Sequence, residues 1–143
     1  MDMLHLKEEI NAMLLKSHND INLSIEDVRE VLKCASRVMY FCESIACPQN
    51  DLDDMRRNIY DIVDRLKVLT SGARVNYLIH IDLDEKIDLD MVRFFMDNLY
   101  ELCEDDATVI FGTNTTKRKY LQKKRVNIEL EICMVFKVLM SVN

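Results

Sequence analysis

Segments with a two-residue hydrophobic period alternate with segments of helical period along this chain, and their order limits the folds it can adopt. Apolar residues one helical turn apart predict helices over 4–17, 24–32, 51–71 and 88–103. Regular alternation of apolar and other residues predicts strands over 35–45, 74–82, 107–111 and 126–140. The last alternation is the longest, and its second face becomes mostly apolar toward Val135 and Leu139.

The order of these elements predicts the fold class. Strands that alternate with helices need crossover connections, which place parallel strands in one sheet and helices on its faces. A basic turn joins the last two strands, so we expect them to form an antiparallel hairpin. The predicted class is α/β: a mixed four-stranded sheet with helices packed on it in a two-layer sandwich, preceded by an N-terminal helix.

The composition is that of a globular domain without a nucleotide-binding loop. Of the 143 residues, 49% are hydrophobic and 31% are charged, which is enough to bury a core. The chain has only two glycines, Gly72 and Gly112, and one proline, Pro48. Phosphate-binding loops need several glycines, because glycine lets the backbone approach phosphate at positive φ. We therefore expect no nucleotide, no other cofactor and no enzymatic activity.

The ends and the thiols of the chain indicate a cytoplasmic protein. No uncharged apolar run of about 18 residues is present, and the start is acidic and polar, so we expect neither a secretory signal nor a membrane span. Five cysteines lack Cys-x-x-Cys spacing, and no histidine accompanies them at zinc-ligand spacing. We expect reduced thiols and no metal site.

Two segments resemble a known family. The strand 105–113, DDATVIFGT, is similar to the "DANIIFG" strand of the C-terminal domain of FtsZ, the bacterial relative of tubulin. The segment 20–32, DINLSIEDVREVL, resembles the synergy loop of FtsZ and the helix after it, "INLDFADVRAVM". The match extends over 13–138 and implies the FtsZ/tubulin C-terminal sandwich without the GTPase domain. Residues 1–19 would correspond to the end of the family's central helix, and residues 20–143 to the C-terminal domain.

The resemblance points to a partner-binding loop. The synergy loop of FtsZ reads Asn-x-Asp-x-x-Asp, and its acidic residues enter the GTP site of the next subunit. The matching positions here are Asn22, Ser24 and Asp27. A serine cannot polarise water as a carboxylate does, so this departure argues against a role in hydrolysis. The alternative is structural, because Ser24 and Asp27 have the spacing of a helix N-cap and its capping-box partner.

Two charged regions have alternative interpretations. The segment 116–125 contains the basic residues Lys117, Arg118, Lys119, Lys123, Lys124 and Arg125 in a chain of net charge −6. Three alternatives are open for this segment. The first is a solvated turn that discourages edge aggregation, the second is a contact for an acidic protein, and the third is a nucleic-acid site. The acidic residues around 82–90 and 104–106 are interpreted as helix caps and solvated turns, since no base or nucleophile accompanies them.

The predicted function is that of a non-catalytic protein-interaction domain that modulates or caps FtsZ-type filaments. In the family, subunits stack head to tail, so a lone domain with the loop would block a filament end. The alternative is a structural or signalling module that self-associates without filament contact. Its expected surface is the sheet face freed by the missing GTPase domain, with Val135 and Leu139 exposed and a homodimer as the product. The expected partner is an FtsZ-type subunit or a second copy, with no membrane, and nucleic acid ranks last among the candidate partners.

Overall fold

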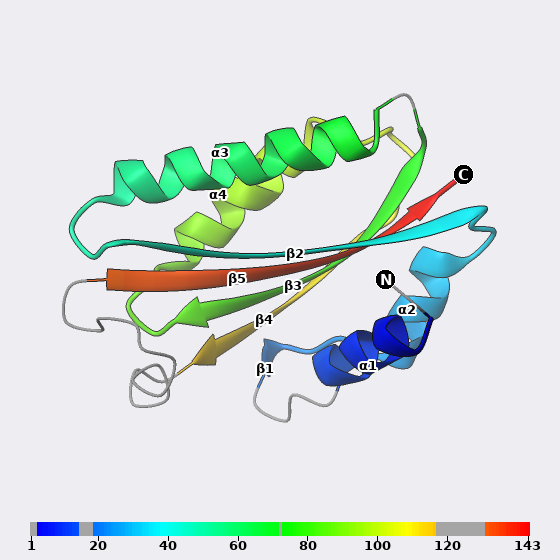
Figure 1. The fold of residues 1–143 in the computed structure, drawn as a ribbon, viewed down its shortest axis with the longest axis horizontal. Helices are drawn as coiled ribbons and strands as arrows, with labels where there is room; N and C mark the ends of the chain where they lie inside the picture. The colour runs from blue at the N-terminus through cyan, green and yellow to red at the C-terminus, as the bar shows by residue number, and fades with distance from the viewer. Residues whose placement is uncertain (1–2, 15–18, 72, 117–130) are drawn as a thin grey trace.

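The structure is a computed structural model that describes residues 3–14, 19–71, 73–116 and 131–143 (Figure 1). The elements in chain order are α1 (Met3–Leu14), β1 (Asn19–Ile21), α2 (Ile25–Leu32), β2 (Arg37–Pro48), α3 (Leu52–Leu69), β3 (Val75–Asp84), α4 (Leu89–Tyr100), β4 (Val109–Thr116) and β5 (Glu131–Val142). This order confirms the predicted succession of helices and strands. It adds the three-residue strand β1, which is too short to produce a periodic signal.

The described residues form one mixed sheet with the strand order β1-β4-β3-β5-β2. β3 and β4 are parallel, whereas β5 runs antiparallel to both β3 and β2. The four long strands are the predicted mixed four-stranded sheet, and β1 extends it by a short antiparallel pairing with β4. The predicted α/β fold class is therefore confirmed.

The predicted hairpin between the last two strands is wrong. β4 and β5 are not neighbours, because β3 lies between them in the sheet. β3 is buried at eight of its ten positions, and it takes an interior place with a partner strand at each edge. β5 is likewise interior, between β3 and β2, which satisfies the backbone groups at both its edges.

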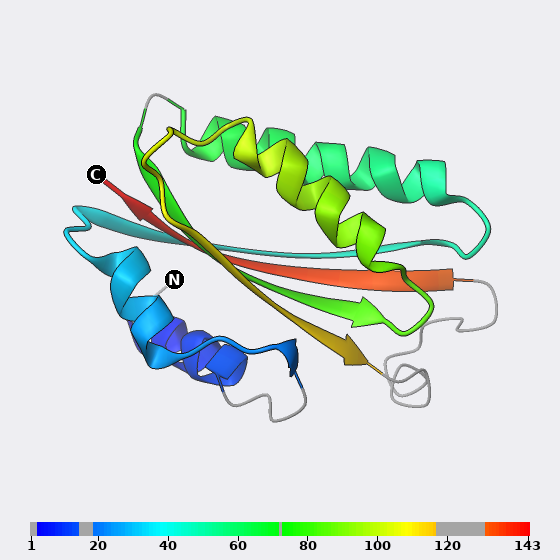
Figure 2. The ribbon, with the colours of Figure 1, turned by 180° about the vertical axis from the view of Figure 1, so that it is seen from behind.

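Helices α3 and α4 cover one face of the sheet and enclose the main core (Figures 1 and 2). The buried stripe of α3 is Met55, Ile59, Ile62, Val63 and Leu66, and the stripe of α4 packs beside it over β3. Residues predicted to face inward at the helix ends do not. Leu52, Leu69 and Leu89 are 45%, 47% and 59% exposed.

Helices α1 and α2 lie on the opposite face and cover one end of it (Figure 2). They enclose a second core made of Met13, Leu23, Val28, Val31, Leu78 and Leu139. The expected exposure of Leu139 is therefore wrong, since its side chain is 0% exposed beneath these helices. Val135, two residues earlier, is partly exposed. Helices α1 and α2 together cover this end of the sheet face, which the sequence pattern had left exposed.

Among the helices in the described ranges, none combines the length and the apolar character that a membrane crossing requires.

Candidate partner-binding loop

The two segments that carry the family resemblance lie side by side in the structure. β1 pairs antiparallel with β4, with Asn19 opposite Asn114 and Ile21 opposite Thr113, and the register shifts between these two pairs. The chain after β1 then passes close to β4 at Gly112 on its way to α2. Residues 22–24 of this segment are the loop that matches the family's synergy loop.

Gly112 permits the loop to approach β4 this closely. A Cβ built at Gly112 would lie 2.7 Å from the backbone oxygen of Ile21 and 2.7 Å from Cγ of Leu23. Both distances are shorter than real Cβ contacts, so only glycine allows the loop to approach β4 this closely. Leu23, which is 5% exposed, packs into the second core at this point. Gly112, in the FtsZ-like strand 105–113, thus allows the FtsZ-like loop at Leu23 to pack against β4.

Ser24 and Asp27 form the capping box that their spacing predicts. Ser24 has extended backbone angles, φ −116° and ψ 167°, and Oγ of Ser24 accepts a hydrogen bond of 3.2 Å from the amide of Asp27. The amide of Ser24 in turn donates to Oδ2 of Asp27 at 2.8 Å. The structural alternative is confirmed, and a contact of these residues with a partner stays a prediction. The box fixes the loop where it enters α2.

The residues beside this box are exposed and include two large apolar side chains. Asn22 is exposed, and Ile21 and Ile25 are 42% and 45% exposed. An amide next to apolar side chains can combine directed hydrogen bonds with burial of apolar area, which is the usual composition of a protein interface.

An apolar hollow of about 270 Å³ adjoins the loop. It is lined by Ile21, Leu89, Val92, Arg93, Met96, Asp97, Tyr100, Phe111 and Thr113, from β1, α4 and β4. Leu89 and Tyr100 are 59% and 48% exposed at this site, while the Thr113 hydroxyl is buried and has no hydrogen-bond partner among the described residues. The amphipathic pattern of α4 had placed Leu89 in the core, so the sequence interpretation missed this hollow.

The residues Ile21, Asn22, Ser24, Leu89 and Tyr100 are called the loop–hollow surface below. They come from three elements that meet only in the folded chain. Of these residues, sequence reasoning had selected Asn22 and Ser24. Ile21, Leu89 and Tyr100 are recognised only from their exposure in the folded chain, where β1 lies beside β4.

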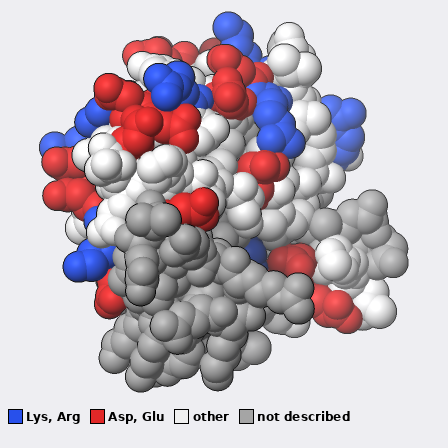
Figure 3. Space-filling model, turned by 60° about the vertical axis from the view of Figure 1, so that its left-hand side comes forward, with Lys and Arg blue, Asp and Glu red and all other residues white. Residues whose placement is uncertain are grey.

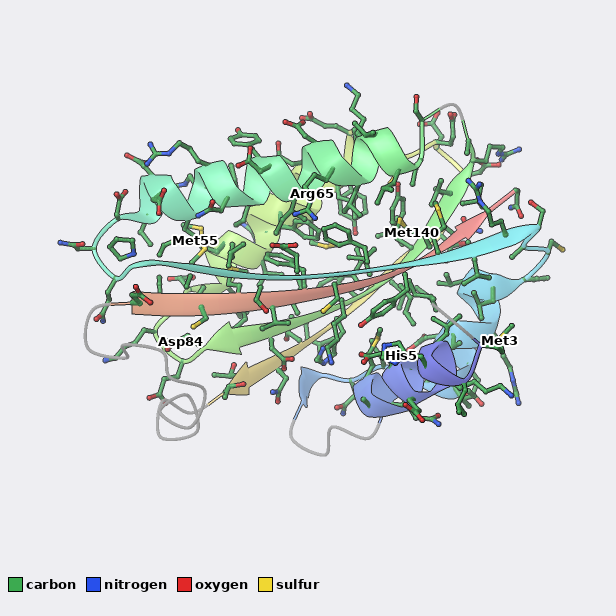
Figure 4. The ribbon with its side chains drawn as sticks, viewed as in Figure 1. Met3, His5, Met55, Arg65, Asp84 and Met140 are labelled. Carbon is green, nitrogen blue, oxygen red and sulfur yellow. The ribbon has the colours of Figure 1, made fainter. Side chains whose placement is uncertain are left out.

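Helix α1 is attached to the sheet by polar contacts as well as by the second core. The Tyr40 hydroxyl donates to Oε2 of Glu9 at 3.0 Å, and Nζ of Lys137 lies 3.7 Å from the same oxygen. His5, one turn away on α1, approaches Oε1 of Glu9 at 3.8 Å (Figure 4). Burial, followed by the hydrogen bond to Glu9, raises the pKa of the Tyr40 phenol. The contacts hold α1 against β2 and β5.

The acidic turns act as caps and local pairs. Asp88 caps α4, and its carboxylate accepts a hydrogen bond of 2.9 Å from the amide of Asp90. Asp84 accepts from the amide of Lys86 at 3.0 Å, while Asp106 pairs with Arg74. In the ranges that the structure describes, no group of three or more His, Cys, Asp or Glu side chains could hold a metal ion.

The remaining predicted features are the cysteines and the basic segment. All five cysteines are free, and burial raises the pKa of the Cys47 and Cys103 thiols, which disfavours the nucleophilic thiolate. The predicted basic contact residues Lys117, Arg118, Lys119, Lys123, Lys124 and Arg125 lie outside the described residues. Where α3 begins, the described acidic and basic side chains are mixed rather than gathered by sign (Figure 3).

Comparison with known proteins shows the fold. No protein-family model matches the chain, and no curated protein matches its sequence. An empty FtsZ dimer structure from M. jannaschii matches 100% of this chain and 40% of its own, with a TM-score of 0.59 and 16% sequence identity. A point mutant of M. jannaschii FtsZ matches 100% of this chain and 42% of its own, with a TM-score of 0.61 and 15% identity. The chain thus has an FtsZ-like fold and spans about two fifths of the length of these structures.

Proposed function

We propose that this chain is a non-catalytic protein-interaction domain that docks on an FtsZ-type subunit through its loop–hollow surface. The observation that carries the proposal is the meeting of the exposed Asn22 loop with an apolar hollow of about 270 Å³. An apolar depression beside a few directed polar groups is the common design of a recognition site. The alternative remains a structural or signalling module that self-associates.

The FtsZ-like fold supports a filament as the target. In the family that the sequence resembles, the face with the synergy loop meets the nucleotide face of the neighbouring subunit. The loop of this chain resembles that loop in sequence and precedes the helix that its capping box begins. A domain docked at that face would block further addition at that filament end.

The Ser24 departure fits docking without catalysis. The hydroxyl of Ser24 and the carboxylate of Asp27 are both engaged in the capping box. A neighbouring GTP site would therefore meet a rigid turn with Asn22 as its outward polar group, and no carboxylate at position 24. We expect the bound domain to occupy the site without promoting hydrolysis there.

Sedimentation of the host cell's FtsZ with GTP, titrated with this domain, tests the proposal. Loss of polymer at substoichiometric amounts is expected, because blocking one end affects a whole filament. Sequestering monomers would require equal amounts. Unchanged assembly at molar excess of the wild-type domain rejects the filament role and favours the self-association alternative.

Two leucines provide a matched pair of variants for this assay. Leu89 and Leu52 each follow an aspartate N-cap as the first residue of a helix, and they are 59% and 45% exposed. Only Leu89 lines the hollow. Leu89→Ala should therefore raise the amount of domain needed for half inhibition by about tenfold, typical of an interface anchor. Leu52→Ala should leave it unchanged, and an equal effect of both would count against the hollow.

A further inference from the structure

The free edge of β2 is long, regular and weakly protected. β2 pairs with β5 at every position from Arg37 to Pro48, without a register shift. On its other side it has no paired strand within the residues that the structure describes. Alternate backbone N–H and C=O groups of such an edge point outward and can accept another strand. Native edges commonly carry lysines, bulges or an early proline, whereas Pro48 is the last residue of this strand.

An apolar hollow of about 380 Å³ runs beside this edge. It is lined by Phe41, Asp64, Arg65, Val68 and Leu69, and Val68 is 77% exposed. Arg65 reaches from α3 toward β2, where its guanidinium lies 5.0 Å from the centre of the Phe41 ring and 3.0 Å from Oε2 of Glu43 (Figure 4). The last turn of α3 therefore overhangs the first half of β2.

The sequence of β2 is complementary to itself. Its only charged residues are Arg37 and Glu43, six positions apart and on the same face. One antiparallel register of two β2 strands places each charge opposite its counterpart, with Tyr40 opposite Tyr40 at the centre. Met39 then faces Phe41 on the α3 side, and Val38 faces Cys42 on the other side. Cross-strand pairs of this kind stabilise a sheet.

We propose that β2 is a homodimerisation edge, pairing antiparallel with β2 of a second copy across a two-fold axis at Tyr40. Such an interface is isologous, so both copies use the same residues. The charge pattern points to a second copy as the occupant, because only this register brings Arg37 of one copy to Glu43 of the other, where it joins the Glu43–Arg65 ion pair of that chain. The overhanging Val68 and Leu69 of both copies then meet near the axis and bury the exposed apolar area beside it.

This edge dimer differs from the self-association expected from the sequence, which used the sheet face at Leu139. It also stands independently of the filament proposal. β2 and β1 occupy opposite edges of the sheet, so pairing through β2 leaves the loop–hollow surface accessible. Failure of the FtsZ sedimentation test therefore leaves the dimer untouched, and a monomeric protein leaves the filament role untouched.

Charge reversal with mixing tests the register. Light scattering of the wild-type chain should give about 34 kDa, twice the monomer mass of 16.8 kDa. Arg37→Glu alone and Glu43→Lys alone each place like charges opposite one another twice, so dimerisation should weaken by about tenfold. Mixing the two variants restores both attractive pairs, and a one-to-one heterodimer should form. This recovery also shows that each variant is folded.

Thiol cross-linking gives a second, geometric test. In a Cys34→Ser background, Val38→Cys faces the native Cys42 of the other copy at two symmetric positions. Treatment with copper–phenanthroline should convert the folded variant into a covalent dimer, because cross-strand neighbours are within disulfide reach. The same variant with Cys42→Ser should stay monomeric on a non-reducing gel. Monomeric wild-type protein at high concentration, or cross-linking that persists without Cys42, overturns the proposal.

Discussion

At one edge of the sheet the three-residue strand β1 is held by packing within the chain, whereas at the other edge the strand β2 faces outward along its full length. The β1 edge depends on Gly112 and Leu23, which bring the loop within contact of β4. The β2 edge is formed by regular pairing with β5 from Arg37 to Pro48, and no strand pairs with its outer side within the described residues. The loop is therefore part of the folded core, while the outer backbone groups of β2 can pair with another strand.

Truncating one apolar side chain at each edge tests the difference between the two edges. Leu23→Ala should lower the free energy of unfolding by about 2–5 kcal/mol, because a leucine that is 5% exposed leaves a cavity in the second core. Val68→Ala, at a side chain that is 77% exposed, should change it by less than about 0.5 kcal/mol. Urea unfolding of dilute protein measures both, and similar losses would contradict the distinction.

A second prediction concerns the close approach at Gly112. Gly112→Ala should destabilise the fold by about 1–3 kcal/mol, because the added methyl overlaps the Ile21 oxygen and the Leu23 side chain. It should also weaken docking by shifting the loop. Adding Leu23→Ala removes part of the overlap, so the double variant should be less destabilised than the sum of the two single changes. Additive losses in denaturant unfolding would show that the two residues are not coupled.

A third prediction separates stability from recognition within the loop. Ser24→Ala removes the N-cap acceptor of α2 and should cost about 1 kcal/mol. A small domain with about 5–15 kcal/mol of stability stays folded after such a loss. Asn22→Ala, at an exposed residue, should leave thermal unfolding unchanged yet weaken inhibition of FtsZ assembly. If Asn22→Ala behaves as wild type in both assays, the loop takes no part in docking.

The smallest effect is a loss of stability at alkaline pH through Tyr40, which joins β2 to α1. The folded-state pKa of Tyr40 is raised, so above pH about 10 the unfolded chain releases this proton before the folded one does. The unfolded state then binds fewer protons, and the free energy of unfolding falls as the pH rises further. Tyr40→Phe should flatten this fall while losing about 1 kcal/mol with the Glu9 hydrogen bond. An unchanged slope between pH 9 and 11 would exclude Tyr40 as its source.

Local features of this fold could be predicted from the sequence, and long-range ones could not. The caps at Ser24, Asp51 and Asp88 are each set by hydrogen bonds to residues two or three positions away, so the spacing alone identifies them. The hairpin of the last two strands failed because strand pairing depends on partners far along the chain. β3 competes for β5 and pairs with it along most of its length.

The candidate site shows the same division between local and tertiary information. Asn22, Ser24 and Asp27 follow from a contiguous pattern, and the capping box was predictable for that reason. The hollow was not predictable, because its lining comes from three elements brought together by the β1–β4 pairing. Leu139 was assigned to a free surface since periodicity cannot show which face α1 and α2 cover.

The placement of the loop and of β2 at opposite edges gives a paired molecule two docking ends. Two sheets joined through β2 would separate the outer strands by about nine strand spacings of about 4.8 Å, or roughly 43 Å. Such a bivalent unit gains avidity only when both ends reach targets at that span. It would then link two filament ends instead of stopping one. Arg37→Glu would separate the copies. The monomer would still block a filament end but could no longer join two filaments, so pairing through β2 would decide which of the two activities the protein has.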